Sequence, residues 1–119
     1  MIKIRILDRE AGKWELIIHL SKTMDMLIQH KQLGSKGMFY VGQDGAILAE
    51  LVYSMSSPDK MIIEHTEVDD SLKGQNVGFE LVSTAVHYAR DHKIKVIPLC
   101  PFAKAVIDKR VDFQDVLAG

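Results

Sequence analysis

Hydrophobic and polar residues alternate along three segments of this chain and then repeat at helical spacing, which predicts strands followed by helices. The extended segments, residues 38–41, 46–55 and 61–68, predict an antiparallel meander. After them we expect, in order, a helix over about 77–92, a strand at 95–99 and a helix over about 102–109. The apolar stripe of the first helix, which we interpret as core-facing, consists of Leu81, Val82, Ala85, Tyr88 and Ala89.

Residues typical of turns separate these elements. Gly42-Gln-Asp-Gly45 is expected to close the first hairpin, because Asp-Gly supplies the positive φ angles that such turns need. Residues 56–60, Ser-Ser-Pro-Asp-Lys, predict the second turn. Pro101 suits the first turn of the last helix, since its missing N–H costs no helical hydrogen bond there.

The first 37 residues give a weaker pattern. Isoleucines at positions 2, 4 and 6 alternate with basic residues and predict a strand, and the apolar-rich segment Trp14–Leu20 predicts a second one. We expect Ser21 to cap a short helix over residues 22–33.

Gly34 is expected to end that helix, and residues 34–37, Gly-Ser-Lys-Gly, resemble a hinge. We therefore divide the chain into an N-terminal extension without an assigned fold, residues 1–37, and a domain at residues 38–119. We expect the domain to fold and to bind its ligand without the extension.

Composition narrows the functional classes. With 119 residues, of which 47% are hydrophobic and 26% charged, the chain suits one domain with its own core. A net charge of −1 gives no electrostatic reason to expect nucleic acid or an anionic membrane as a partner. We find no apolar run near the ~20 residues of a membrane span and no pattern of a secretory leader.

Cysteine and histidine are sparse. Cys100 is the single cysteine, so no intramolecular disulfide can form, which suits a reducing cytoplasm. The five histidines are scattered and show no metal-ligand spacing. We therefore expect a cytoplasmic protein without a bound metal.

Residues 72–82, Leu-Lys-Gly-Gln-Asn-Val-Gly-Phe-Glu-Leu-Val, are the most informative stretch. They form a loop rich in small residues between a predicted strand and a predicted helix. The first N–H groups of a helix have no partner within it and the helix dipole favours negative charge there, so such a loop can bind phosphate or pyrophosphate. Turn formation alone is the alternative explanation of the glycines.

Four landmarks follow one another in residues 38–119. They are His65-Thr66-x-Val68, Leu72-x-Gly74-Gln75-x-Val77-Gly78-x-x-Leu81-Val82, Lys95-Val-Ile-Pro98-Leu-Cys100-Pro101-Phe102-Ala103 and Phe113-Gln114-Asp115. In these landmarks the segment resembles the small GCN5-related N-acetyltransferase-like proteins of the compact YjdJ type. The resemblance implies an α/β protein with a mixed sheet and the compact acyl-CoA N-acyltransferase fold. Residues 1–37 show no counterpart in this subfamily.

The resemblance also implies an acetyl-CoA site in the loop. Its expected residues are Val68, Lys73, Gly74, Gln75, Asn76, Val77 and Gly78. Lys73 stands where the family often has arginine. It supplies a positive charge but lacks the planar guanidinium group that binds a phosphate through two hydrogen bonds. Asn76 replaces the usual glycine and is the next most tolerant of left-handed geometry, although its side chain can crowd the phosphate.

Two residues are candidates for catalysis, because the resemblance places the acetyl thioester between residues 64–68 and 96–100. His65 has the chemistry of a general base, and Cys100, just before a helix start, can become a thiolate nucleophile. The structural alternatives are a hydrogen-bonded strand histidine and a core cysteine. Val106 occupies the slot where the compact family has a proton-donating tyrosine, and valine cannot donate a proton.

These observations favour an acetyl-CoA-dependent N-acetyltransferase for a small-molecule amine or an exposed protein amine, with an acetyl-cysteine as one route. A non-catalytic acetyl-CoA-binding or sensing module is the alternative that Val106 favours. A structural subunit whose loop binds nothing is a third. The acceptor amine and the oligomeric state have no signal in the sequence.

Overall fold

The structure is a computed structural model that describes residues 3–8, 14–19, 27–43 and 45–118. Its strands are β1 (Lys3–Asp8), β2 (Trp14–His19), β3 (Gln29–Leu33), β4 (Lys36–Gln43), β5 (Ala46–Ser57), β6 (Lys60–Val68) and β7 (Lys95–Pro98). Its helices are α1 (Val77–Asp91) and α2 (Pro101–Asp108), with the short 3-10 helices η1 (Asp70–Leu72) and η2 (Val111–Val116). Neither α1 nor α2 has the length and hydrophobicity of a membrane-spanning helix.

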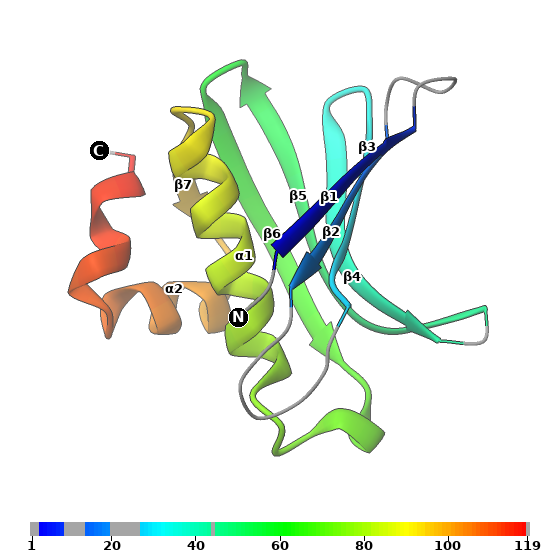
Figure 1. Ribbon diagram of the computed structural model, residues 1–119. Coiled ribbons are helices and arrows are strands. Elements are labelled where there is room, and N and C mark those ends of the chain that lie inside the picture. Colours follow the sequence, from blue (N-terminus) through cyan, green and yellow to red (C-terminus); the bar gives the residue numbers. More distant parts are fainter. Residues whose placement is uncertain (1–2, 9–13, 20–26, 44, 119) are drawn as a thin grey trace.

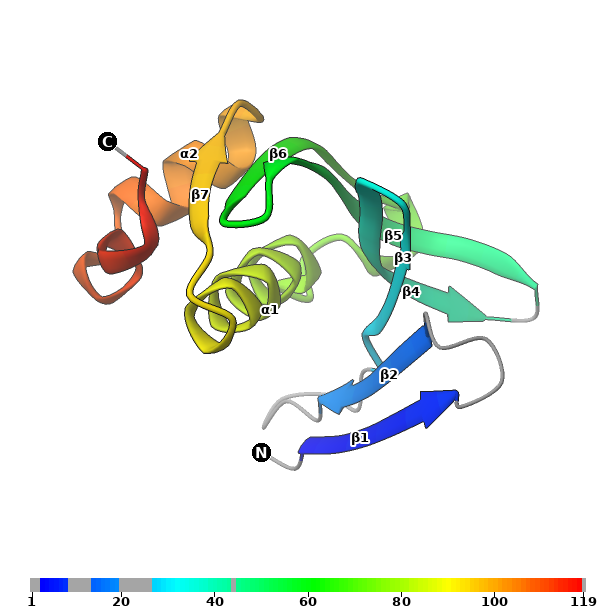
Figure 2. The same ribbon diagram turned by 90° about the horizontal axis from the view of Figure 1, so that it is seen from above.

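The described strands form one mixed sheet in the order β1-β2-β3-β4-β5-β6-β7. Each strand pairs antiparallel with the next, except that β6 and β7 are parallel and are joined through α1. The sheet is curved, and α1 lies inside the curve (Figures 1 and 2). This is the mixed α/β architecture that the sequence predicted from residue 38 onward.

The core lies between α1 and the concave face of the sheet. The predicted stripe of α1 is confirmed, because Leu81, Val82, Ala85 and Ala89 are fully buried and Tyr88 packs at their edge. The sheet contributes alternate residues, as a half-buried sheet requires, and among these are Phe39, Leu51, Tyr53, Met61 and Ile63.

The predictions for the first 37 residues are partly wrong. Strands were expected at both ends of residues 1–20, and β1 and β2 confirm them within the described residues. The helix expected over residues 22–33 is wrong at its C-terminal end, because Gln29–Leu33 is strand β3; residues 22–26 lie outside the described residues. The expected hinge is a hairpin turn, since Leu33 pairs with Lys36 and Gly34 has φ 62° between them.

Strand β3 also belongs to the core. It pairs with β4 along its whole length, from Gln29 opposite Tyr40 to Leu33 opposite Lys36. Ile28, just before it, is fully buried, and His30 is 3% exposed. This packing argues that the folded unit includes residues 28–37.

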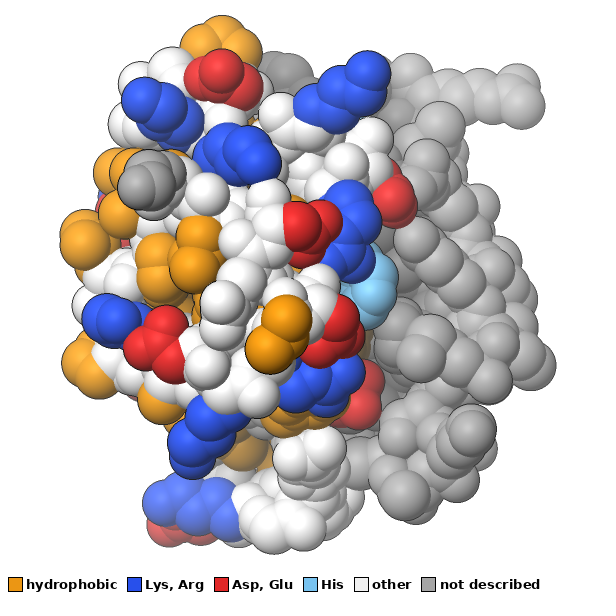
Figure 3. Space-filling model, turned by 90° about the vertical axis from the view of Figure 1, so that its left-hand side faces the viewer, with side chains coloured by type: hydrophobic (Ala, Val, Ile, Leu, Met, Phe, Trp, Pro, Cys, Tyr) orange, Lys and Arg blue, Asp and Glu red, His pale blue; other side chains and the backbone are white. Residues whose placement is uncertain are grey.

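The predicted C-terminal tail is η2, which closes over the end of α1 and the edge of β7. Arg90 donates two hydrogen bonds to the Asp115 carboxylate, at 2.8 and 2.6 Å, and Lys95 donates to the Asp115 carbonyl at 2.8 Å. Leu117 forms a bridge with Val96. The face of the molecule on this side mixes hydrophobic, acidic and basic side chains (Figure 3).

Candidate functional site

Strands β6 and β7 separate partway along β6. Their parallel pairing runs from Lys60 opposite Lys95 to Ile63 opposite Pro98, where β7 ends. The backbone N–H groups of Leu99 and Cys100 both donate to the Ile63 carbonyl at 3.1 Å, and the chain then turns into α2. The β7-side edge of residues 64–68 therefore has no strand partner among the described strands, and this is where the resemblance places the thioester.

The loop after β6 is built from tight turns. Asp69 caps η1 by accepting hydrogen bonds from the amide and the hydroxyl of Ser71, which lower the pKa of its carboxyl. Two residues then take left-handed conformations, Gly74 with φ 83° and Asn76 with φ 65°. The expectation that Asn76 tolerates this geometry in place of glycine is confirmed, because φ 65° and ψ 23° lie in the left-handed region.

Helix α1 begins with amides that have no partner within the helix. Its first helical hydrogen bond runs from the Glu80 N–H to the Asn76 carbonyl, at 3.1 Å. Because a helix pairs each N–H with the carbonyl four residues earlier, the N–H groups of Val77, Gly78 and Phe79 have no partner within α1. Such amides suit an anion, and anion binding at this helix start stays a prediction.

The loop and both helices surround a cleft of about 740 Å³. Its lining residues are Val68, Leu72, Lys73, Gly74, Asn76, Val77, Gly78, Phe79, Phe102 and Val106. Six of the seven residues expected to bind the cofactor therefore line one cleft. Its volume falls in the usual range of about 300–1,000 Å³ for small-molecule sites.

Gln75 is the exception among the expected loop residues. Its amide donates to the Leu72 carbonyl at 3.3 Å and its side chain to the Ser71 carbonyl at 3.3 Å, so it holds the loop together instead of lining the cleft. Lys73 lines the cleft and is 69% exposed, and its ammonium lies 3.0 Å from the Asp70 carboxylate. An exposed ion pair of this kind is weak, so Lys73 is available to an anionic ligand.

Sequence reasoning missed two aromatic residues of the cleft. Phe79 follows Gly78 on α1, and Phe102 follows Pro101 on α2. Phe102 is 45% exposed, which is high for so large an apolar side chain. Val106, one turn later on α2, extends the same wall, so the position where the family has tyrosine does face the cleft.

Cys100 lies beside Thr66, and its thiol is 3.6 Å from the Thr66 hydroxyl. Thr66 lies within residues 64–68, the segment of β6 that the resemblance sets across the thioester from residues 96–100. Burial raises the pKa of the thiol, but hydrogen bonds from the Ala103 and Phe102 amides and from Thr66 outweigh burial, and the net pKa is lowered. The residue is 5% exposed and does not line the cleft.

His65 lies on the other face of β6. Successive side chains of a strand point to opposite faces, and Thr66 pairs with the fully buried Leu51 on the α1 side. His65 therefore points away from α1, where its Nε2 lies 2.9 Å from Oε2 of Glu50 on β5. His65 and Cys100 do not form a Cys–His pair.

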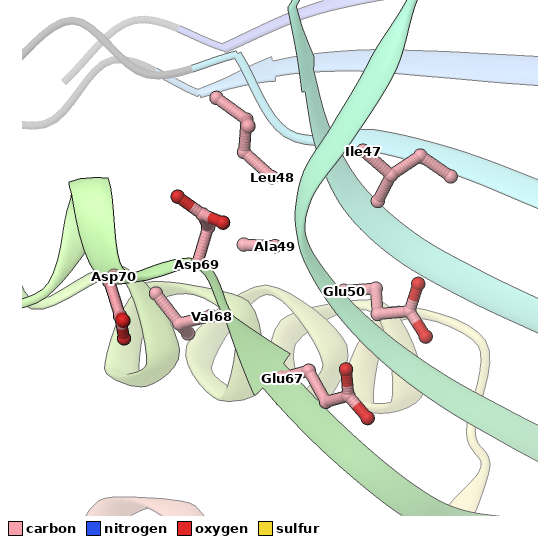
Figure 4. A pocket seen from close by; sticks show the side chains of 8 residues that line it. All are labelled: Ile47, Leu48, Ala49, Glu50, Glu67, Val68, Asp69 and Asp70. Carbon is pink, nitrogen blue, oxygen red and sulfur yellow. The ribbon is translucent and has the colours of Figure 1, made fainter.

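A second hollow, of about 320 Å³, lies where β5 begins and β6 ends. It is lined by Ile47, Leu48, Ala49, Glu50, Glu67, Val68, Asp69 and Asp70 (Figure 4). Val68, the last residue of β6, lines both this hollow and the cleft, so the two spaces lie on either side of it. Across the described residues, no group of three or more His, Cys, Asp or Glu side chains converges as a metal site.

The sequence that forms these elements matches a known family. A family model described as GCN5-related N-acetyl-transferase matches residues 38–116. The chain belongs to this family. The match confirms the resemblance found in the sequence, and it begins at β4, although the folded core also includes β3.

Solved structures agree with this assignment. A solution structure of a GCN5-like N-acetyltransferase candidate from Staphylococcus aureus is 40% identical, with a TM-score of 0.60, and the alignment covers 76% of this chain and 87% of that one. A search of the curated proteins gave no match.

Two more distant structures share the fold. An IAA acetyltransferase from Bacillus cereus is 20% identical, with a TM-score of 0.50 over 63% of this chain and 53% of that one. A ribosomal-protein-alanine N-acetyltransferase from Brucella melitensis biovar Abortus is 15% identical, with a TM-score of 0.50 over 74% of this chain and 65% of that one. At these identities the likeness concerns the fold alone.

Proposed function

We propose that this protein is an acetyl-CoA-dependent N-acetyltransferase that acts on a small-molecule amine or an exposed protein amine. The observation that carries the proposal is the set of free amides at the start of α1, which opens into a cleft beside the unpaired edge of β6. Family membership supports the reaction type, and the cleft supports acetyl-CoA as the cosubstrate.

The residues present fit CoA by their chemistry. The N–H groups of Val77, Gly78 and Phe79 and the ammonium of Lys73 suit the pyrophosphate. Apolar walls from Leu72, Val68, Phe102 and Val106 suit the pantetheine arm. In this proposal the unpaired edge of β6 receives the arm and brings the thioester to residues 64–68.

A non-catalytic acetyl-CoA-binding or sensing module is the second candidate. The observation that favours it is Val106, which lines the cleft where the compact family has a proton-donating tyrosine. Direct transfer remains chemically possible without that tyrosine, because the attacking amine itself carries a proton that can pass to the leaving sulfur. The two candidates share CoA binding and differ only in turnover.

Transfer through an acetyl-cysteine at Cys100 is the alternative route. The lowered pKa of the thiol supports it, since a thiolate is the nucleophilic form. The burial of Cys100 opposes it, because the sulfur has to reach the thioester. We propose direct transfer as the main route and acetyl-Cys100 as the alternative.

Calorimetry with CoA, followed by an amine-acetylation assay, tests the proposal. Lys73→Ala should weaken CoA binding about tenfold, the loss expected for one hydrogen bond to a charged group. Lys60→Ala removes an equal charge from the opposite end of β6 and should leave affinity unchanged. Equal affinities in both variants, or no CoA binding by the wild type, would contradict the site; binding without turnover on any amine would favour the sensing module.

A further inference from the structure

Glu50 and His65 form a hydrogen-bonded pair outside the cleft. It joins β5 to β6 on the face of the sheet away from α1, with 2.9 Å between Oε2 of Glu50 and Nε2 of His65. The side chains are 26% and 47% exposed, respectively, so the imidazole is open to solvent while the carboxylate is more enclosed. An exposed ion pair contributes little to stability, which leaves the orientation of the ring as its main effect.

We propose that Glu50 is a positioning residue that holds His65 as the general base for the acceptor amine. This inference rests on the proposed function and adds to it the residue that takes the proton of the acceptor. It also names the face from which the acceptor approaches, which is the face opposite to α1 and to the thiol of Cys100.

The hydrogen bond decides which nitrogen of His65 is the base. An ionised carboxylate only accepts hydrogen bonds, so Nε2 must carry the hydrogen that faces Glu50. In the neutral ring Nδ1 then holds the lone pair, on the side of the imidazole away from Glu50. When Nδ1 takes a proton, Nε2 keeps its hydrogen and its hydrogen bond to Glu50, so the ring keeps its orientation during the transfer.

The position of His65 suits this role. It lies on the stretch of β6 beyond Ile63, where β7 no longer pairs with the strand. Val68, which lines both the hollow and the cleft, follows three residues later. Figure 4 shows that the Glu50 carboxylate points away from β5 on the same side as that of Glu67. An amine on this face can therefore meet a thioester that reaches the edge of β6 from the cleft.

The protons of the reaction balance without a tyrosine. The acceptor arrives as an ammonium ion with three hydrogens on nitrogen, and Nδ1 of His65 takes one and later releases it to water. The free amine attacks the thioester carbonyl, the C–N bond forms and the C–S bond breaks. A second hydrogen passes to the leaving sulfur and the third stays on the amide, so the products are the acetamide, free thiol and one proton.

The test compares Glu50→Gln with Glu67→Gln in the full-length protein. Glu67 lies directly opposite Glu50 and lines the same hollow, but it makes no hydrogen bond to His65 within the described part of the chain. Each variant is assayed at pH 7 with an alkylamine, which is protonated, and with an arylamine, which is not. Circular dichroism and thermal melts first establish that both variants fold.

Glu50→Gln should lower kcat for the alkylamine at least tenfold, within the ~10²–10⁴-fold range of general-base catalysis. It should leave KM for acetyl-CoA unchanged and affect the arylamine by less than about threefold, because that amine needs no base. The alkylamine rate of the variant should recover toward that of the wild type as the pH approaches the pKa of the amine. Equal losses with both amines, or equal losses in both variants, would overturn the role of Glu50.

A nitrogen-15 NMR spectrum of the imidazole gives a readout that does not need turnover. Wild-type His65 should hold its hydrogen on Nε2 when neutral, and Glu50→Gln should mix the two tautomers while Glu67→Gln should not. If the wild type acetylates no amine, the proposed function fails, and this spectrum still decides whether Glu50 positions His65. An unchanged tautomer in Glu50→Gln would overturn the inference by itself.

Discussion

Gly78 on α1 lies directly against the ring of Phe102 on α2. A Cβ atom built at Gly78 would stand 2.7 Å from Cζ and 2.9 Å from Cε2 of Phe102, closer than side chains pack. Gly78 has a helical conformation, so its role is not a positive φ angle. Its missing side chain lets Phe102 form a wall of the cleft immediately beside the unpaired amides of α1.

We predict that Gly78→Ala weakens CoA binding by displacing the Phe102 ring toward the cleft. The expected loss is about tenfold, and the melting temperature should change little because the ring is half-exposed and can move. In a Phe102→Ala background the added methyl should have almost no effect, so calorimetry on the four proteins should show strong coupling. Additive losses would mean that the methyl obstructs the ligand itself.

The elements from β4 onward could be predicted because local and tertiary preferences agree in them. The stripe of α1 follows a helical period, and Gly45 and Gly74 stand at positive φ angles where turns require them. In the segment Gln29–Leu33 the local and tertiary preferences disagree. It carries four polar residues, its Leu33 is 66% exposed and its buried side chain is a histidine, so no alternation of apolar residues marks it as a strand.

The candidate site likewise contains residues that the sequence could predict and residues that it could not. The loop at residues 73–78 could be found because its chemistry is contained in consecutive residues. Phe102 lies 24 residues from Gly78, and its contact depends on how α1 and α2 pack. The pairing of Glu50 with His65 depends on the register between β5 and β6, which shifts between Val52 and Tyr53. The spacing of residues along the sequence does not reveal such a shift.

The burial of β3 predicts the result of truncation. A chain of residues 38–119 would lose Ile28 and His30 and expose Phe39 and Tyr53, all of which are buried. Since burying a large side chain stabilises by about 1.5–3 kcal/mol, we expect this chain to unfold or aggregate. A chain of residues 27–119 retains β3 and should melt cooperatively by circular dichroism. Cooperative melting of both would restore the boundary at residue 38.

His30 predicts a loss of stability in acid. It stacks on Phe39 with ring centroids 4.2 Å apart, its Nε2 lies 2.6 Å from the Tyr53 hydroxyl, and its Nδ1 has no partner among the described residues. Burial, assisted by the nearby charge of His92, lowers the pKa of His30 from 6.5 to about 4. The titratable neighbours on the packed elements are Tyr53, Tyr88 and His92, and Glu15 of β2 is its partner in register.

The folded state keeps His30 neutral down to about pH 4, whereas the unfolded state protonates it below about pH 6.5. The free energy of unfolding that depends on neutral His30 is therefore fully present above about pH 6.5. The free energy of unfolding falls as the pH is lowered from 6.5 to about 4, by up to about 3 kcal/mol. His30→Leu should therefore melt with a smaller pH dependence in this window. Tyr53→Phe removes the hydrogen bond but keeps the imidazole, so it should lower the melting temperature and keep the wild-type slope. Equal slopes in wild type and His30→Leu would contradict the prediction.

The placement of Cys100 predicts how acetyl-CoA modifies the protein. The thiol is buried beside Thr66 and lies outside the cleft, so we expect it to resist alkylation in the native state despite its lowered pKa. Intact-protein mass spectrometry after incubation with acetyl-CoA should then show no acetyl adduct, a gain of about 42 Da for a covalent acyl intermediate. Cys100→Ser serves as the matched control. An adduct that appears in the wild type and is absent from Cys100→Ser would mean that transfer passes through Cys100, and the sulfur would then have to turn from Thr66 toward the thioester before each reaction.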